Sequence, residues 1–122
     1  MSTELALFVG FILHFVGDYL LQSDWMATNK TKNGAACLLH AAVYSAPFYF
    51  ICDFAPLIVL ISVTHFLIDR FRLAKYWIML INWDWHQNSP DRPAYISFWL
   101  LVVVDNTFHI IFNSLAIFLS YQ

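Results

Sequence analysis

Four long apolar stretches, joined by short polar connections, constrain the fold of this 122-residue chain more than any other feature. They cover approximately residues 5–22, 34–52, 56–74 and 95–119. A helix needs about 20 apolar residues to cross a bilayer, with a range of about 17–25. Charged residues make up only 11% of the chain, against about 25% in a soluble domain. The sequence therefore predicts an all-α polytopic membrane protein: one transmembrane domain, residues 1–122, built as a four-transmembrane-helix bundle.

The positions of the basic residues predict how this bundle is oriented. Lys and Arg occur in two connections only, as Lys30 and Lys32 in the first and as Arg70, Arg72, Lys75 and Arg92 in the third. The positive-inside rule then places both connections in the cytoplasm and both termini outside. The first stretch lacks a basic segment before it, so we interpret it as a mature helix and not as a signal peptide. The Trp-rich segment 76–93 is expected to lie at the membrane interface.

Histidine and aspartate recur at a spacing of four residues inside three of the apolar stretches. This spacing puts the two side chains of each pair on one face of a helix. In the fourth stretch the aspartate precedes the histidine, and that stretch runs in the opposite direction, so every pair places its aspartate nearer the cytoplasm. Together with a further histidine in the second stretch, the pairs form what we call the His/Asp set: His14, Asp18, His40, His65, Asp69, Asp105 and His109.

The His/Asp set has the composition of a metal site. Ionisable side chains cost about 2.5–3.5 kcal/mol each inside a membrane helix and usually face one another. A single such pair is more often a contact between helices, but three matched pairs and a fourth histidine favour a shared divalent ion. Imidazole and carboxylate suit zinc, and manganese is an alternative. Seven candidate ligands exceed one tetrahedral zinc, so the sequence predicts one or two ions, a pair being about 3.5–4 Å apart.

Such a site predicts a metal-dependent hydrolase of a phosphoester or ester. We expect Asp18, Asp69 and Asp105 to be catalytic, with Asp18 as general base. Expected contacts to an anionic substrate, either lipid-linked or a cytosolic phosphorylated small molecule, are Gln22, Asp24, Asn29 and Lys30. The lipid bilayer is the expected partner and a homo-oligomer is compatible with the sequence. Nucleic acid is not an expected partner because the chain has no basic patch.

Two other classes of function fit the same residues. A seam of histidine and aspartate can relay protons or pass metal ions, but the outer halves of the four stretches are almost purely apolar, which disfavours a pore in a single chain. A binding or inhibitory membrane protein of phage type would use the metal only as a structural staple. In that case the Trp-rich segment would matter more than the aspartates.

The same residues carry a resemblance to a known family. The motif H-x-x-x-D-Y-L-L-Q-S-D-W-M-A-x-x-K runs from His14 to Lys30, and L-L-H, H-F-L-I-D and D-x-x-x-H follow it. This pattern resembles the small bacterial and phage membrane proteins of domain-of-unknown-function family 3307. The resemblance implies a polytopic protein of the bacterial inner membrane and implies no established reaction. A looser similarity connects such proteins with membrane-bound metal-dependent hydrolases. One departure is Asn106, where the family pattern leads us to expect Gln.

Overall fold

The structure, a computed structural model, describes residues 1–52, 54–85 and 93–122. Over these residues it is all-α, as predicted, and contains six α-helices. Their bounds are α1 Thr3–Phe15, α2 Asp24–Asn29, α3 Gly34–Ser45, α4 Ala55–Phe71, α5 Leu73–Asn82 and α6 Ala94–Ser120. A π-helical turn, η1 (Val16–Leu20), continues α1, and a 3₁₀ segment, η2 (Ala46–Phe50), continues α3.

Two of these helices are long and apolar enough to cross a membrane. One is Thr3–Leu20, formed by α1 with η1, and the other is Ala94–Ser120. Within the predicted stretch of about 56–74, α4 ends at Phe71. There Arg72 adopts a left-handed backbone conformation (φ 51°, ψ 51°), and α5 begins at the next residue. The predicted interfacial segment 76–93 is therefore helical as far as Asn82, where α5 ends. Its residues 86–92, which include Arg92, lie outside the described residues.

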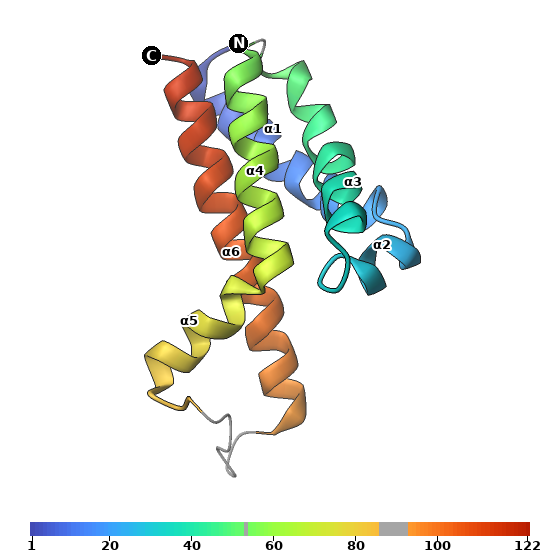
Figure 1. The fold of residues 1–122 in the computed structure, drawn as a ribbon. Helices are drawn as coiled ribbons and strands as arrows, with labels where there is room; N and C mark the ends of the chain where they lie inside the picture. The colour runs from blue at the N-terminus through green and yellow to red at the C-terminus, as the bar shows by residue number, and fades with distance from the viewer. Residues whose placement is uncertain (53, 86–92) are drawn as a thin grey trace.

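The helices pack around a shared centre. α4 packs against both α3 and α6, α1 packs against α6, and η1 returns to α3. In Figure 1 the two termini lie at one end of the bundle, while α2 and the α4–α5 junction lie toward the other. α5 turns away from the bundle at that second end (Figure 1). The arrangement places the inner faces of α3, α4, α6 and η1 opposite one another.

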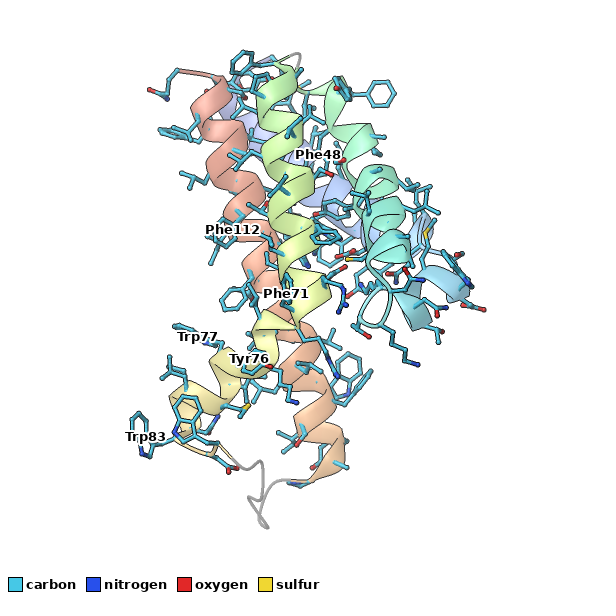
Figure 2. The ribbon with its side chains drawn as sticks, viewed as in Figure 1. Phe48, Phe71, Tyr76, Trp77, Trp83 and Phe112 are labelled. Atoms are coloured by element: carbon cyan, nitrogen blue, oxygen red, sulfur yellow. The ribbon has the colours of Figure 1, made fainter. Side chains whose placement is uncertain are left out.

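The apolar core lies nearer the end with the termini. It is built from Ala6, Tyr44, Phe48, Ile61 and Ile117, with neighbours from the same helices. The outer faces remain apolar as well: Phe8 is 63% exposed, Phe50 85% and Trp83 76%, and Figure 2 shows such side chains projecting from the helices. Extensive exposed apolar surface marks contact with a membrane or another protein.

Polar caps fix the connection between the first two stretches. Ser23 begins α2 by accepting a hydrogen bond from the Met26 amide at 3.2 Å. Asn33 begins α3 by accepting one from the Ala35 amide at 2.8 Å. Caps of this kind satisfy amides that have no partner within the helix. They hold Lys30 in a short, ordered connection, with its amide donating to the Met26 carbonyl at 2.9 Å.

Replacing Gly17 with alanine is expected to destabilise the protein. Gly17 lies in η1, and a Cβ there would overlap the ring of Tyr44, which is fully buried and stacked on His65. Overpacking of this kind costs about 1–3 kcal/mol. Thermal unfolding in detergent measures the effect. Gly34→Ala is the matched control, since nothing lies within 4 Å of its Cβ position, and an alanine in a helix is about 0.5–1 kcal/mol better than glycine. Equal behaviour of the two variants would contradict this packing.

Candidate metal centre

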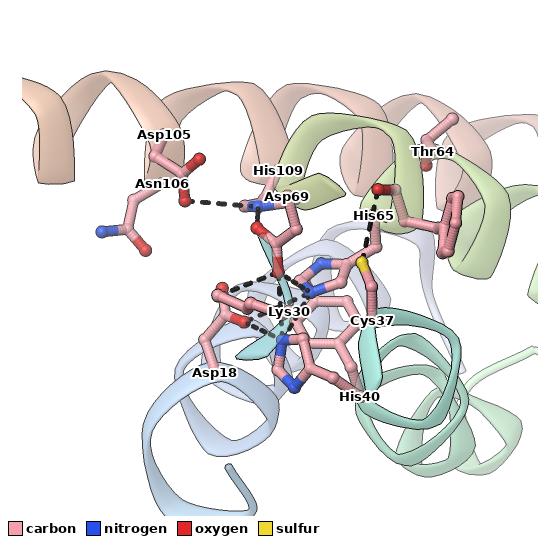
Figure 3. Close-up of polar contacts among 12 residues, drawn as sticks. Asp18, Lys30, Cys37, His40, Thr64, His65, Asp69, Asp105, Asn106 and His109 are labelled. Atoms are coloured by element: carbon pink, nitrogen blue, oxygen red, sulfur yellow. Dashed lines mark hydrogen bonds and ion pairs between the residues drawn. The ribbon is translucent and has the colours of Figure 1, made fainter. Parts of the chain in front are cut away.

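The structure brings the His/Asp set together inside the bundle. Six of the side chains, from η1, α3, α4 and α6, converge on one centre (Figure 3), and His14 of α1 lies next to them, with Nδ1 3.6 Å from Asp18 Oδ2. Six of the seven residues are buried, and Asp105 is partly exposed, with 29% of its side chain accessible. Convergence follows from the spacing of four, which keeps each pair on the inner face of its helix.

The first group of possible metal ligands joins Asp18, His40, His65 and Asp69. The two histidine Nε2 atoms lie 2.9 Å apart. Asp18 Oδ1 lies 3.1 and 3.3 Å from them, and Asp69 Oδ2 lies 3.2 Å from each. Ligands placed about 2.0 Å from a tetrahedral zinc are about 3.3 Å from one another. These distances, 2.9–3.3 Å, are close to or slightly shorter than those of a tetrahedral site.

The second group joins Asp69, Asp105 and His109. His109 Nε2 lies 3.1 Å from Asp69 Oδ1 and 3.4 Å from Asp105 Oδ2. Asp69 therefore belongs to both groups and offers one carboxylate oxygen to each. A carboxylate in this position can bridge two ions.

The immediate surroundings of these ligands fit a metal only in part. The donor types, imidazole nitrogen and carboxylate oxygen, are those that zinc binds. Asp69 Oδ2, however, already lies 2.9 Å from Lys30 Nζ and 3.2 Å from the Nε2 atoms of His40 and His65. The Nδ1 atoms of His40 and His65 have no hydrogen-bond partner within the described chain, although the outer nitrogen of a metal-bound histidine usually donates a hydrogen bond. Stacking orients His65 instead: its ring centroid lies 3.6 Å from that of Tyr44 and 4.1 Å from that of His109.

Lys30 also reaches the centre. Its Nζ lies 2.9 Å from Asp69 Oδ2, and only 18% of its side chain is exposed. Burial lowers the pKa of Lys30, but the negative charges of Asp69 and Asp18 outweigh burial, so this pKa is above its usual value and the ammonium stays charged. Lys30 thus neutralises the carboxylate that the two groups share.

His14 lies beside the two groups and belongs to neither of them within the described chain. The Tyr44 hydroxyl accepts a hydrogen bond from Asn113 and so is free to donate its own proton to His14 Nδ1, 2.8 Å away. His14 Nε2 is then the protonated nitrogen and donates to Asn106 Oδ1 at 2.7 Å. Both ring nitrogens are occupied in this arrangement. Its predicted role as a ligand remains a prediction.

Two of the four predicted substrate contacts, Lys30 and Gln22, line cavities at the centre, and the other two do not. Lys30 lines two cavities, of about 340 and 160 Å³, and Gln22 lines the smaller one together with Asp18 and Asp105. Gln22 does not continue the helical face of His14 and Asp18, because the i→i+5 hydrogen bonds of η1 widen the last turn and the helix ends at Leu20. Asp24 is exposed and Asn29 donates to the Trp25 carbonyl of its own helix. Neither is among the described residues that line the two cavities.

The sequence interpretation assigned no role at this site to two residues, Asn113 and Arg72. Asn113 lies one turn beyond His109, so the spacing of four that identified Asp105 and His109 could have found it. Arg72 lines the larger cavity, and its sequence signal is only that of a basic residue in a connection. The left-handed backbone that positions it has no clear signal in the sequence, since glycine or asparagine is the usual residue there.

Comparison with protein families identifies the family to which the chain belongs. The model of the family described as "Protein of unknown function (DUF3307)" covers residues 6–122, and the chain belongs to this family. No curated protein and no solved structure matches the chain.

Proposed function

We propose that this DUF3307 protein is an integral membrane hydrolase whose buried two-metal centre cleaves a phosphoester or ester. The observation that carries the proposal is the pair of ligand groups that share Asp69. Two-metal sites bridged in this way recur in enzymes that cleave phosphoesters and amides. A carboxylate shared by two groups of possible metal ligands, six residues of which five are buried, is more than a structural contact between helices requires.

Several features support a bilayer as the environment. Two helices have the length and apolarity of membrane spans, and α4, with 17 residues, falls at the lower limit of about 17–25 residues. The termini lie at one end of the bundle (Figure 1), as an even number of crossings requires. Lys30 and Arg72 lie toward the other end. We propose four spans in a bacterial inner membrane, with the basic connections in the cytoplasm and both termini outside.

In the proposed mechanism the two groups of possible ligands would hold zinc or manganese. A divalent ion supplies Lewis acidity, which polarises the bond to be cleaved and activates water as a nucleophile. Asp69 fixes the separation of the groups, and Asp105 and His109 complete the second one. Asp18 lines the smaller cavity, where it is placed to accept the proton of the attacking water. The ammonium of Lys30 favours an anionic substrate in the same space.

Transport is the weaker candidate. A proton or ion path would have to continue from the centre to the end with the termini. The described residues in that direction form the apolar core around Phe48, Ile61 and Ile117. This core argues against a polar path through one chain.

The proposal is tested by metal content and hydrolysis on the same sample. Full-length protein purified in detergent without chelator is expected to carry two zinc or manganese ions per chain by mass spectrometry. It should hydrolyse a chromogenic phosphoester or ester, lose that activity after chelation, and regain it with the ion. Folded protein without metal would overturn the metal centre. Two tightly bound ions without hydrolysis of any ester would instead support a structural metal.

A further inference from the structure

We infer that the larger cavity binds the phosphate group of a membrane lipid, with Arg72 contacting the phosphate, Lys30 adding positive charge to the cavity wall and α6 contacting the acyl chains. The inference rests on the proposed function and names the class of substrate. It concerns the cavity of about 340 Å³ formed by the connection after α2, the α4–α5 junction and the first half of α6. Asp69 and Asp105 of the metal centre form part of its wall.

The cavity has one polar and one apolar side. Lys30, Arg72, Asp69 and Asp105 provide its charges. Its apolar lining includes Ala74, Phe98, Leu101 and Val102. A soluble phosphorylated metabolite would leave this apolar side without a partner, whereas a lipid fills both sides. The division of the lining therefore favours a lipid as the source of the phosphate.

Arg72 is the cation available for the phosphate. Lys30 is already paired with Asp69, and His109 contacts Asp105. Arg72, in contrast, forms no ion pair with any residue in the described ranges. A guanidinium binds phosphate through two parallel hydrogen bonds. Once metal occupies the carboxylates, the charges that would repel a phosphate are neutralised as well.

The backbone at Arg72 fixes the position of this residue between α4 and α5. Its left-handed conformation, with φ 51°, separates α4 from α5. It is less favourable for arginine than for glycine, because the Cβ atom crowds the following carbonyl oxygen. Helices nevertheless often end on a left-handed residue, and Trp83 ends α5 with the same φ of 51°. At Arg72 this conformation directs α5 away from the bundle and leaves Arg72 and Ala74 at the edge of the cavity.

The apolar side of the cavity is continuous with the exposed face of α6. Phe98, which lines the cavity, is 60% exposed, and its neighbour Trp99 is 60% exposed. On α5, Tyr76 and Trp77 are also exposed (Figure 2). An acyl chain lying along Phe98 and Leu101 would remain in contact with the surrounding lipid. The phosphate could thus reach the metal centre without the lipid leaving the bilayer.

Binding, measured separately from hydrolysis, tests the inference. The full chain in detergent is titrated by native mass spectrometry with phosphatidic acid, with diacylglycerol, which lacks the phosphate, and with glycerol phosphate, which lacks the chains. Phosphatidic acid is expected to bind at least about tenfold more tightly than either, which corresponds to about 1.4 kcal/mol. Equal binding of diacylglycerol would overturn the role of the phosphate. Displacement by glycerol phosphate at equal concentration would overturn the lipid source.

The Arg72→Gly variant tests the assigned contact. Glycine suits the left-handed backbone, so the variant keeps the fold and loses the arginine side chain with its charge. We expect its affinity for phosphatidic acid to fall about tenfold, the effect of one charge-assisted contact. Lys75→Ala is the matched control, because Lys75 carries the same charge three residues further on and is not among the residues lining the cavity. Equal losses in the two variants would overturn the assignment. Lipid binding by a metal-free, inactive protein would refute the hydrolase and leave this site standing.

Discussion

Asp69→Asn is expected to remove both metal ions, whereas Asp105→Asn should remove one. Asp69 gives Oδ2 to the group with His40 and His65 and Oδ1 to the group with His109. Asp105 takes part in the second group only. Loss of a partner outside the coordination sphere already costs about 10–100-fold in affinity, so loss of a ligand should cost at least about 100-fold at each ion it contacts. Metal content per chain, measured by mass spectrometry, is expected to be two, zero and one for wild type, Asp69→Asn and Asp105→Asn.

Two controls separate loss of a ligand from loss of the fold. Asp69→Asn leaves Lys30 without its partner, so the double variant Lys30→Met/Asp69→Asn should restore helicity and monodispersity but not metal. His14→Gln removes an imidazole that lies outside both groups and should keep both ions. Retention of two ions by Asp69→Asn would refute the shared carboxylate. Loss of an ion from folded His14→Gln would show instead that His14 is a ligand, as the sequence predicts.

Lys30→Met is expected to make stability depend on metal. The ammonium lies 2.9 Å from Asp69 Oδ2, and the exposed fractions of the two side chains are 18% and 1%. Removing one partner of a buried ion pair costs about 3–5 kcal/mol, because the other charge is left uncompensated. A bound divalent ion supplies that compensation, so the loss should be large after chelation and small with metal. Thermal unfolding in detergent, with and without chelator, measures both values.

Lys32→Met is the matched control for this variant. Lys32 is an exposed residue of the same connection, and exposed substitutions usually change stability by less than about 0.5 kcal/mol. The double variant Lys30→Met/Asp69→Asn should recover much of the stability lost in chelator, since neither charge is then left alone. A Lys30→Met protein as stable as Lys32→Met without metal would show that the ion pair contributes nothing.

The helices and the convergence of the His/Asp set could be predicted because both depend on local spacing. A separation of four residues places His65 with Asp69, and Asp105 with His109, on one helical face whatever the neighbouring helices are. The first residues of α2 and α3 could also be predicted, since Ser23 and Asn33 are capping residues by type. The end of the first helix could not be predicted, because the sequence of η1 does not distinguish a π-turn from the α-helix that precedes it.

The sequence by itself determined that this protein is all-α, that its helices are apolar on the outside, and that histidines and aspartates face inward from three of them. Only the tertiary structure decided which contacts each of these residues makes. Asp69 is shared by two groups of possible ligands, His14 forms hydrogen bonds with Tyr44 and Asn106, and Lys30 forms an ion pair with Asp69. The reason is physical. Periodicity fixes the face on which a side chain lies, but which atoms meet across that face depends on how the helices pack and on single backbone turns, at η1 and at Arg72, that have no period.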